Sequence, residues 1–187
     1  MRPMEATLTK RLTYSDYVQM TPPDSGKFQL IEGELISMTS PNTKHQGIIL
    51  SISFHLYSYL LKNRLGKIFL SPMDVILGEN NTYQPDLLFI LESNKKIIEE
   101  TKINGTPDMV VEVLSPSNAY YDLVIKKKIY ESSGVKEYWI VDPIQDTLDL
   151  YVLQNNKFQH KVQIEKKGII PSEIFPGLDL DLEKILQ

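Results

Sequence analysis

The spacing of apolar side chains, together with residues that start and stop helices, predicts three helices. Apolar residues recur at helical spacing over residues 45–62, which predicts the longest helix. Thr13, followed three residues later by Asp16, indicates the start of a short helix near the N-terminus. A third helix is expected over roughly residues 120–133, with Gly134 as its C-terminal stop.

Short apolar runs between these helices predict strands. Two such runs flank Glu32-Gly33 and predict a hairpin, and a second hairpin is expected around residues 154–157. Further strands are indicated by the runs IFLSP, MDVILG, QPDLLFI, DMVVEVLS and EYWIVD. Strands interleaved with helices predict an α/β fold in which a mixed β-sheet is flanked by helices. We expect residues 1–12 to form a flexible leader and residues 13–187 to form a single domain.

Composition narrows the class of protein. The chain has no cysteine, which excludes disulfides and thiolate chemistry and fits a reducing cytoplasm. Its N-terminus does not resemble a secretory signal, and its apolar runs are shorter than the roughly 18–20 residues that span a bilayer. We therefore expect a cytoplasmic protein with no membrane partner. The formal net charge of −4 counts modestly against a nucleic-acid partner, although a local basic patch can coexist with it.

Glu112 lies inside the apolar run of residues 109–114. On a strand it shares one face with Val110 and Leu114, and both faces of that strand are otherwise apolar. An unpaired carboxylate in such a central strand is strongly disfavoured, so a metal, a basic partner or the open end of the strand must compensate it. A structural salt bridge or an edge strand is the alternative explanation.

Asp86 opens another apolar strand, directly after Pro85. Pro-Asp is a common turn dipeptide, so Asp86 alone is weak evidence for a site. Two carboxylates on neighbouring strands, however, would suit a hard cation such as Mg²⁺, which takes oxygen ligands. Such an ion can activate a water molecule and stabilise the charge that grows on a phosphodiester. We therefore expect Asp86 and Glu112 to bind Mg²⁺, with Mn²⁺ as a substitute.

Two further side chains at the start of predicted elements are candidates. Glu34 follows Gly33 at the head of a strand and is either an additional site acid or an ordinary solvated hairpin residue. His45 is either a residue of the helix start or a hydrogen-bonding partner in the site. The sequence has no cluster with zinc-ligand spacing, no phosphate-binding glycine motif and no nucleophile-elbow motif.

The helix after Glu112 carries Asp122, Lys126 and Tyr130, spaced four residues apart. Side chains at this spacing lie along one stripe of a helix. The stripe is either a solvated, salt-bridged face, as is usual for a run of lysines, or it presents a cation to the site beside Glu112.

These motifs together resemble one known family. The stretch EVLSPS, Asp122, Lys126, Tyr130, Gly134-Val135 and EYWIVDP is similar to the Uma-two family of restriction-endonuclease-like proteins, which is common in cyanobacteria. Gly33-Glu34, His45 and Gln84-Pro85-Asp86-Leu87 also fall where the pattern of that family places them. The resemblance extends from about residue 13 to residue 153.

The resemblance implies a fold and an activity. The Uma-two family is placed in the PD-(D/E)XK nuclease superfamily, which implies a restriction-endonuclease-like core and metal-dependent phosphodiester hydrolysis. Asp86 matches the first acid of the motif, Glu112 the second, and Glu34 would be an additional acid. The chain departs from D/E-x-K, because Leu114 stands where the motif has lysine. The family pattern offers Lys126 as a migrated substitute.

Three functions are compatible with these residues. The leading hypothesis is a Mg²⁺-dependent endonuclease that cuts DNA, as a homodimer. The alternative is a catalytically inactive nuclease fold that binds nucleic acid or acts in assembly, which Leu114 and the acidic net charge favour. A metal-free glycosidase with two carboxylates is disfavoured, because it needs an aromatic sugar cleft and the single tryptophan, Trp139, lies in a buried-looking strand.

Overall fold

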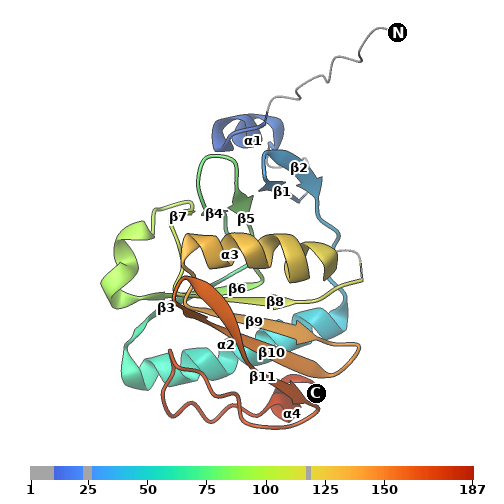
Figure 1. Ribbon diagram of the computed structural model, residues 1–187, viewed down its shortest axis with the longest axis vertical. Helices are drawn as coiled ribbons and strands as arrows, with labels where there is room; N and C mark the ends of the chain where they lie inside the picture. The colour runs from blue at the N-terminus through green and yellow to red at the C-terminus, as the bar shows by residue number, and fades with distance from the viewer. Residues whose placement is uncertain (1–10, 23–26, 117–118) are drawn as a thin grey trace, which may run out of the picture.

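The computed structural model describes residues 11–22, 27–116 and 119–187 of the chain. Figure 1 shows a layered arrangement of helices and sheets. In chain order the elements are α1 (Tyr14–Met20), β1 (Phe28–Ile31), β2 (Glu34–Ser37), α2 (Thr43–Asn63), β3 (Gly66–Leu70), β4 (Val75–Ile76), β5 (Thr82–Tyr83), β6 (Leu87–Leu91), the 3₁₀ helix η1 (Glu92–Ile97), β7 (Ile103–Asn104), β8 (Met109–Val113), the π-helical turn η2 (Tyr121–Lys126), α3 (Lys127–Ser133), β9 (Glu137–Asp142), β10 (Thr147–Gln154), β11 (Lys157–Glu165) and α4 (Leu182–Ile185).

The helix ends follow the local chemistry of the sequence. Thr13 and Asp16 form a reciprocal capping box at the start of α1, as the sequence predicts. Gly134 ends α3 in the left-handed conformation, φ +91°, also as predicted. Arg64 ends α2 in the left-handed conformation, with φ +50°. Gly66 begins β3, where a Cβ would lie 2.0 Å from the carbonyl oxygen of Ile90.

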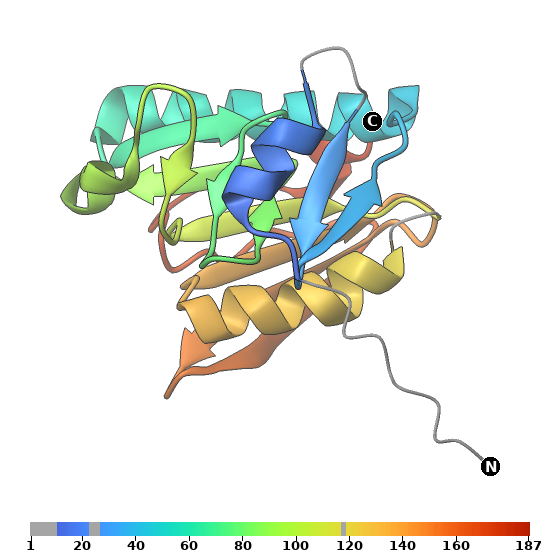
Figure 2. The same ribbon diagram turned by 90° about the horizontal axis from the view of Figure 1, so that it is seen from above.

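A six-stranded sheet forms the centre of the fold. Its strand order is β11-β10-β9-β8-β6-β3, and β8 and β9 pair in parallel while the other neighbours are antiparallel. Helix α2 and the C-terminal segment pack on one face of this sheet, and α3 packs on the other. Figure 2 shows these layers from above. The prediction of a mixed sheet flanked by helices is confirmed.

Strand β8 lies between β6 and β9, and packing on the two sides of the sheet buries both of its faces. Met109, Val111 and Val113 join the core under α2. Val110 joins the second core, under α3. Because side chains alternate along a strand, Glu112 lies on the α3 side as well. The prediction that Glu112 belongs to a central strand is therefore confirmed.

A second, smaller sheet packs above the α3 side of the central sheet. Its strand order is β2-β1-β5-β4-β7, and it contains the predicted hairpin of β1 and β2. The sequence predicts only part of this sheet, because β5 and β7 have two residues each and no alternation long enough to detect. Through Gln29, strand β1 of the small sheet lines the same pocket as Glu112 and Val113 of β8.

The ends of the chain are described in part. Residues 1–10, most of the predicted leader, lie outside the described residues. The C-terminal tail forms the short helix α4 and a bridge between Ile169 and Asp181. Among the described residues, no helix combines the length and apolar character needed to cross a membrane.

Candidate active site

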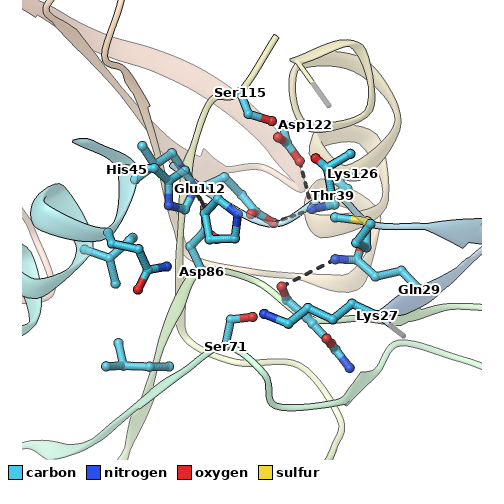
Figure 3. Close-up of a pocket in the computed structure, with 17 residues that line it drawn as sticks. Lys27, Gln29, Thr39, His45, Ser71, Asp86, Glu112, Ser115, Asp122 and Lys126 are labelled. Atoms are coloured by element: carbon cyan, nitrogen blue, oxygen red, sulfur yellow. Dashed lines mark hydrogen bonds and ion pairs between the residues drawn. The ribbon is translucent and has the colours of Figure 1, made fainter. Parts of the chain in front are cut away.

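A polar pocket opens where β1, the start of α2 and the end of β8 meet (Figure 3). Its walls come from both sheets, from α2 and from the helical segment after β8. Among its lining residues are Lys27, Gln29, His45, Ser71, Gln84, Asp86, Glu112, Ser115, Asp122 and Lys126. Segments that are far apart in sequence thus place acidic, basic and amide side chains around one space.

Glu112 anchors the inner wall of this pocket. Its side chain is almost fully buried, and its Oε1 accepts hydrogen bonds from the Lys126 Nζ at 3.0 Å and the Tyr130 hydroxyl at 2.8 Å. The Lys126 Nζ also lies 2.8 Å from the Asp122 Oδ1. One ammonium group is therefore shared by two buried carboxylates, and all three helical side chains lie on the stripe that the sequence predicts.

Burial and charge set the protonation of this cluster. Burial raises the pKa of Glu112 to about 8, and the neighbouring Asp122 and Asp86 act in the same direction, while Lys126 opposes them. Burial also raises the pKa of Asp122. Burial alone would lower the pKa of Lys126, but the negative charges of Glu112 and Asp122 outweigh burial, so the pKa of Lys126 is raised above its usual value. Lys126 therefore stays protonated, and the cluster has more carboxylates than cations.

Asp86 occupies the opposite wall of the pocket. Its Oδ2 accepts a hydrogen bond from the backbone N–H of Val113 at 2.8 Å and lies 3.1 Å from the Nε2 of His45. The first contact fixes Asp86 against β8, next to Glu112. Burial acts to lower the pKa of His45, but the hydrogen bond and charge of Asp86 outweigh it and the pKa is raised.

His45 is positioned by the start of α2. Asn42 caps the helix, because its side chain accepts a hydrogen bond from the His45 backbone N–H at 2.9 Å. This cap directs the His45 imidazole across the pocket to Asp86. The two roles left open by the sequence are therefore combined, since His45 is both a first-turn residue of the helix and a hydrogen-bonding partner of the site.

The structure brings together most of the residues singled out from the sequence. Asp86, Glu112, His45, Asp122 and Lys126 all line the pocket, and Tyr130 lies behind Glu112. Asp122, Lys126 and Tyr130 are all buried, so the alternative of a solvated, salt-bridged helix face is wrong for this stripe.

Glu34 is the exception. The structure places it at the turn end of the hairpin, opposite Ile31, with its side chain exposed and outside the pocket. The pocket is reached instead by Gln29, which lies two residues earlier than Ile31 on the same strand face. The expectation that Glu34 joins the site is therefore not met by the geometry, because the hairpin presents a different residue.

Gln29 is the main residue that sequence reasoning missed. Its side chain is 1% exposed, and its Nε2 donates a weak hydrogen bond to the Gln84 carbonyl oxygen at 3.4 Å. Its Oε1 is buried with no hydrogen-bond partner among the described residues. The signal was present in the sequence, because Gln29 interrupts the apolar run FQLI just as Glu112 interrupts its own strand.

The oxygen atoms of the pocket suit a hard cation. Among the described residues, the Glu112 Oε2 and the Asp86 Oδ1 have no hydrogen-bond partner, whereas the other oxygen of each carboxylate is engaged. In the described part of the chain, no group of three or more acidic, histidine or cysteine side chains is placed so that it could hold a metal ion. A two-carboxylate site, completed by water, fits Mg²⁺ better than a metal that needs an all-protein cage.

Comparisons with known proteins give matches that cover most of the chain. The family model Uma2, described as "Putative restriction endonuclease", matches residues 14–183. The uncharacterized protein sll1609 of Synechocystis sp. is 28% identical over 141 residues, which cover 74% of this chain and 79% of that protein. The crystal structure of a "putative nuclease belonging to DUF820" from Anabaena variabilis superposes with a TM-score of 0.77 at 20% identity, covering 94% of this chain and 97% of the other. The latter likeness is evidence of a shared fold.

Proposed function

The chain belongs to the Uma2 family of restriction-endonuclease-like proteins, and on that premise we propose that it is a Mg²⁺-dependent endonuclease that hydrolyses phosphodiester bonds of DNA. The observation that carries the proposal is a pocket lined by Asp86, Glu112 and Asp122, in which the latter two carboxylates share the ammonium group of Lys126. Buried negative charge in excess of the available cations is costly unless a cation or a proton joins it. A pocket that opens this charge to solvent is suited to bind a divalent ion.

Asp86 and Glu112 would hold the metal ion through their uncommitted oxygen atoms. When bound, Mg²⁺ would supply a Lewis acid for a hydrolytic water and for the scissile phosphate. The chain itself positions the two carboxylates, because the Val113 N–H and His45 hold Asp86 while Lys126 and Tyr130 hold Glu112. These contacts hold one oxygen atom of each carboxylate in place and leave the other facing the pocket.

Lys126 would take the role that the motif assigns to a lysine two residues after Glu112. Leu114 occupies that position and cannot stabilise an anion. Lys126 reaches the same carboxylate from the following helix, with its Nζ at the pocket wall. We propose that this ammonium group stabilises the additional negative charge of the phosphodiester transition state. Lys27, from the strand end before Gln29, is a second basic side chain at the pocket and would contact the DNA backbone.

Metal binding tests the proposal directly. Mg²⁺ or Mn²⁺ should raise the melting temperature of the wild type, because a ligand that binds only the folded state stabilises it by mass action. The double variant Asp86→Asn/Glu112→Gln should lose this gain. The matched control is Glu165→Gln, which removes an exposed carboxylate on β11 and should keep it.

Cleavage of supercoiled plasmid by the same variants completes the test. We expect Mg²⁺-dependent nicking by the wild type and by Glu165→Gln, and none by the double variant. Equal thermal gains in all three proteins would place the ion elsewhere. A wild type that binds DNA but neither binds metal nor nicks the plasmid would favour the alternative of a catalytically inactive binding module.

A further inference from the structure

Helix α2 carries a row of exposed apolar side chains on the side that faces away from the core. Leu50, Phe54, Tyr57 and Leu61 are 69, 65, 56 and 64% exposed. They follow one another at intervals of four, three and four residues, so they lie along one stripe of the helix. The opposite face of α2 already packs on the central sheet. The exposed row therefore takes no part in the hydrophobic core of a single chain.

The same stretch of α2 has no charged side chain. From Gln46 to Leu61 the sequence contains no Asp, Glu, Lys or Arg, although the solvent side of a surface helix is normally charged or polar. Figure 2 shows α2, in cyan, along the outer edge of the molecule, with no element of the described chain on its outer side. An uncharged apolar row in this position is typical of a surface that a partner covers.

A shallow groove extends this apolar surface. It lies beside the C-terminal half of α2 and is lined by Tyr57, Leu60, Leu61, Ile68 and Phe69, with Arg64, Lys67 and Glu92 also at its wall. Ile68 and Phe69 belong to β3, which is an edge strand of the central sheet. We call the four exposed residues of α2 together with Ile68, which packs on the α2 side of the sheet, the α2 face. An apolar centre with charged residues beside it has the composition of a protein–protein interface.

We propose that the α2 face binds the α2 face of a second copy of this chain, in a two-fold symmetric dimer whose α2 helices run antiparallel. The spacing of the row favours this occupant, because intervals of four, three and four read the same in both directions. A two-fold axis between Phe54 and Tyr57 sets Leu50 opposite the partner's Leu61 and Phe54 opposite the partner's Tyr57. A surface that is complementary to itself meets the requirement of an isologous interface.

The area of the row, together with the groove, approaches that of a small specific interface. If each large apolar side chain offers about 150–200 Å², the exposed parts of the four residues sum to roughly 400–500 Å² per chain. Two copies would then bury roughly 800–1,000 Å² through the row alone, and the groove adds to this. Specific interfaces begin at about 1,000 Å² in total. The dimer does not depend on the proposed nuclease activity, because the α2 face is separate from the pocket residues that would bind the metal ion.

Sedimentation and light scattering of two double variants test both the dimer and its orientation. Leu50→Glu/Leu61→Glu places like charges opposite each other in the antiparallel dimer and should yield monomers, with the dissociation constant raised at least about a hundredfold. Leu50→Glu/Leu61→Lys places opposite charges there and should retain more dimer. Within one chain the two positions are about 16 Å apart along the helix, so they do not pair internally.

Ile144→Glu is the matched control, because Ile144 is 77% exposed and lies in the turn before β10; this variant should dimerise like the wild type. Circular dichroism would establish that each variant is folded. If both double variants are monomeric, the helices do not run antiparallel and the proposed register is wrong. A monomeric wild type at tens of micromolar, or two double variants that dimerise as well as the wild type, would overturn the proposal and leave the α2 face to another occupant.

Discussion

Two buried glutamates on neighbouring parallel strands lie on opposite faces of the sheet and differ in their hydrogen-bond partners. Glu112 lies near the end of β8 on the α3 side of the sheet, and Glu137 begins β9 on the α2 side. Both are at most 2% exposed, and burial raises the pKa of both. The Glu137 carboxylate accepts hydrogen bonds from the Ser172 hydroxyl at 2.8 Å and from the backbone N–H groups of Glu173 and Ile174 at 3.3 Å.

The difference separates a structural carboxylate, Glu137, from the proposed metal ligand, Glu112. Both oxygen atoms of Glu137 are occupied by donors from a single segment, which the carboxylate attaches to the sheet. Glu112 has one occupied oxygen, faces a pocket, and shares its lysine with Asp122. Burial alone therefore does not indicate a site. A buried carboxylate indicates a site when one of its oxygen atoms has no partner and its neighbours carry an excess of negative charge.

The largest expected effect comes from neutralising the two glutamates in turn. Glu112→Gln should lower Mg²⁺-dependent cleavage at least a hundredfold, because it removes a proposed metal ligand and the partner of Lys126. Glu137→Gln should leave the cleavage rate per folded molecule within about threefold, because its contacts lie on the other face of the sheet. Single-turnover assays on plasmid DNA measure both. Equal losses would mean that the two sites do not differ as proposed.

Replacing the lysine should have a somewhat smaller effect on cleavage. Lys126→Met, which keeps most of the side-chain volume, should lower the cleavage rate on the order of a hundredfold. It should leave binding of Mn²⁺ largely intact. The apo protein should lose stability, because removing one partner of a buried ion pair leaves uncompensated charge.

Lys128 provides the matched control for Lys126. It is exposed two positions further along the same helix, so Lys128→Met should affect only the salt-dependent affinity for DNA. Cleavage at the normal rate by Lys126→Met, with folding confirmed, would exclude the migrated-lysine role. Loss of cleavage by Lys128→Met instead would mean that Lys128, and not Lys126, has this role.

Truncating Glu137 should change stability rather than chemistry. Glu137→Ala leaves the Ser172 hydroxyl and two backbone N–H groups without their acceptor, which we expect to cost about 2–3 kcal/mol of unfolding free energy. Urea denaturation of the variant in parallel with Glu165→Gln measures this loss. A cost below about 0.5 kcal/mol would mean that the segment of residues 172–174 does not depend on the carboxylate.

The smallest expected effect is a pH dependence of stability without metal. The pKa of Glu112 is raised to about 8 in the folded protein, from about 4.3 in an unfolded chain. The folded state then binds the proton more tightly, so the contribution of Glu112 to stability is fully present below about pH 4.3 and is lost as pH rises towards 8. Because Asp122 and Lys126 belong to the same cluster, we expect a decline on the order of 1 kcal/mol.

Glu112→Gln should remove most of this decline, and Mg²⁺ should offset it in the wild type. Chemical denaturation at pH 5, 6, 7 and 8, with and without Mg²⁺, compares the two proteins. A wild type whose stability rises with pH over this range in the absence of metal would show that Glu112 is ionised and fully compensated by Lys126.

Much of the site was predictable from local sequence. Glu112 and Gln29 each interrupt an apolar strand, and a polar residue in such a position must find a partner or a solvent-filled space. The stripe of Asp122, Lys126 and Tyr130 follows from helical spacing alone. The start of α1 at Thr13 and the end of α3 at Gly134 follow from capping chemistry, which acts within a few residues.

Other features depended on contacts between distant segments. Glu34 and Gln29 lie five residues apart, yet only the packing of the small sheet decides that Gln29 reaches the pocket. The strands β5 and β7 are too short to have a periodicity, and pairing with distant strands creates them.

What the sequence by itself determined, therefore, is which side chains need compensation and where helices and strands begin. The tertiary structure decided which of these side chains share one pocket, that Lys126 lies between Glu112 and Asp122, and that Glu137 is satisfied by a segment 35 residues away. The physical reason is that propensity and capping act over a few residues, whereas the energy of a buried charge depends on neighbours that only the folded chain supplies.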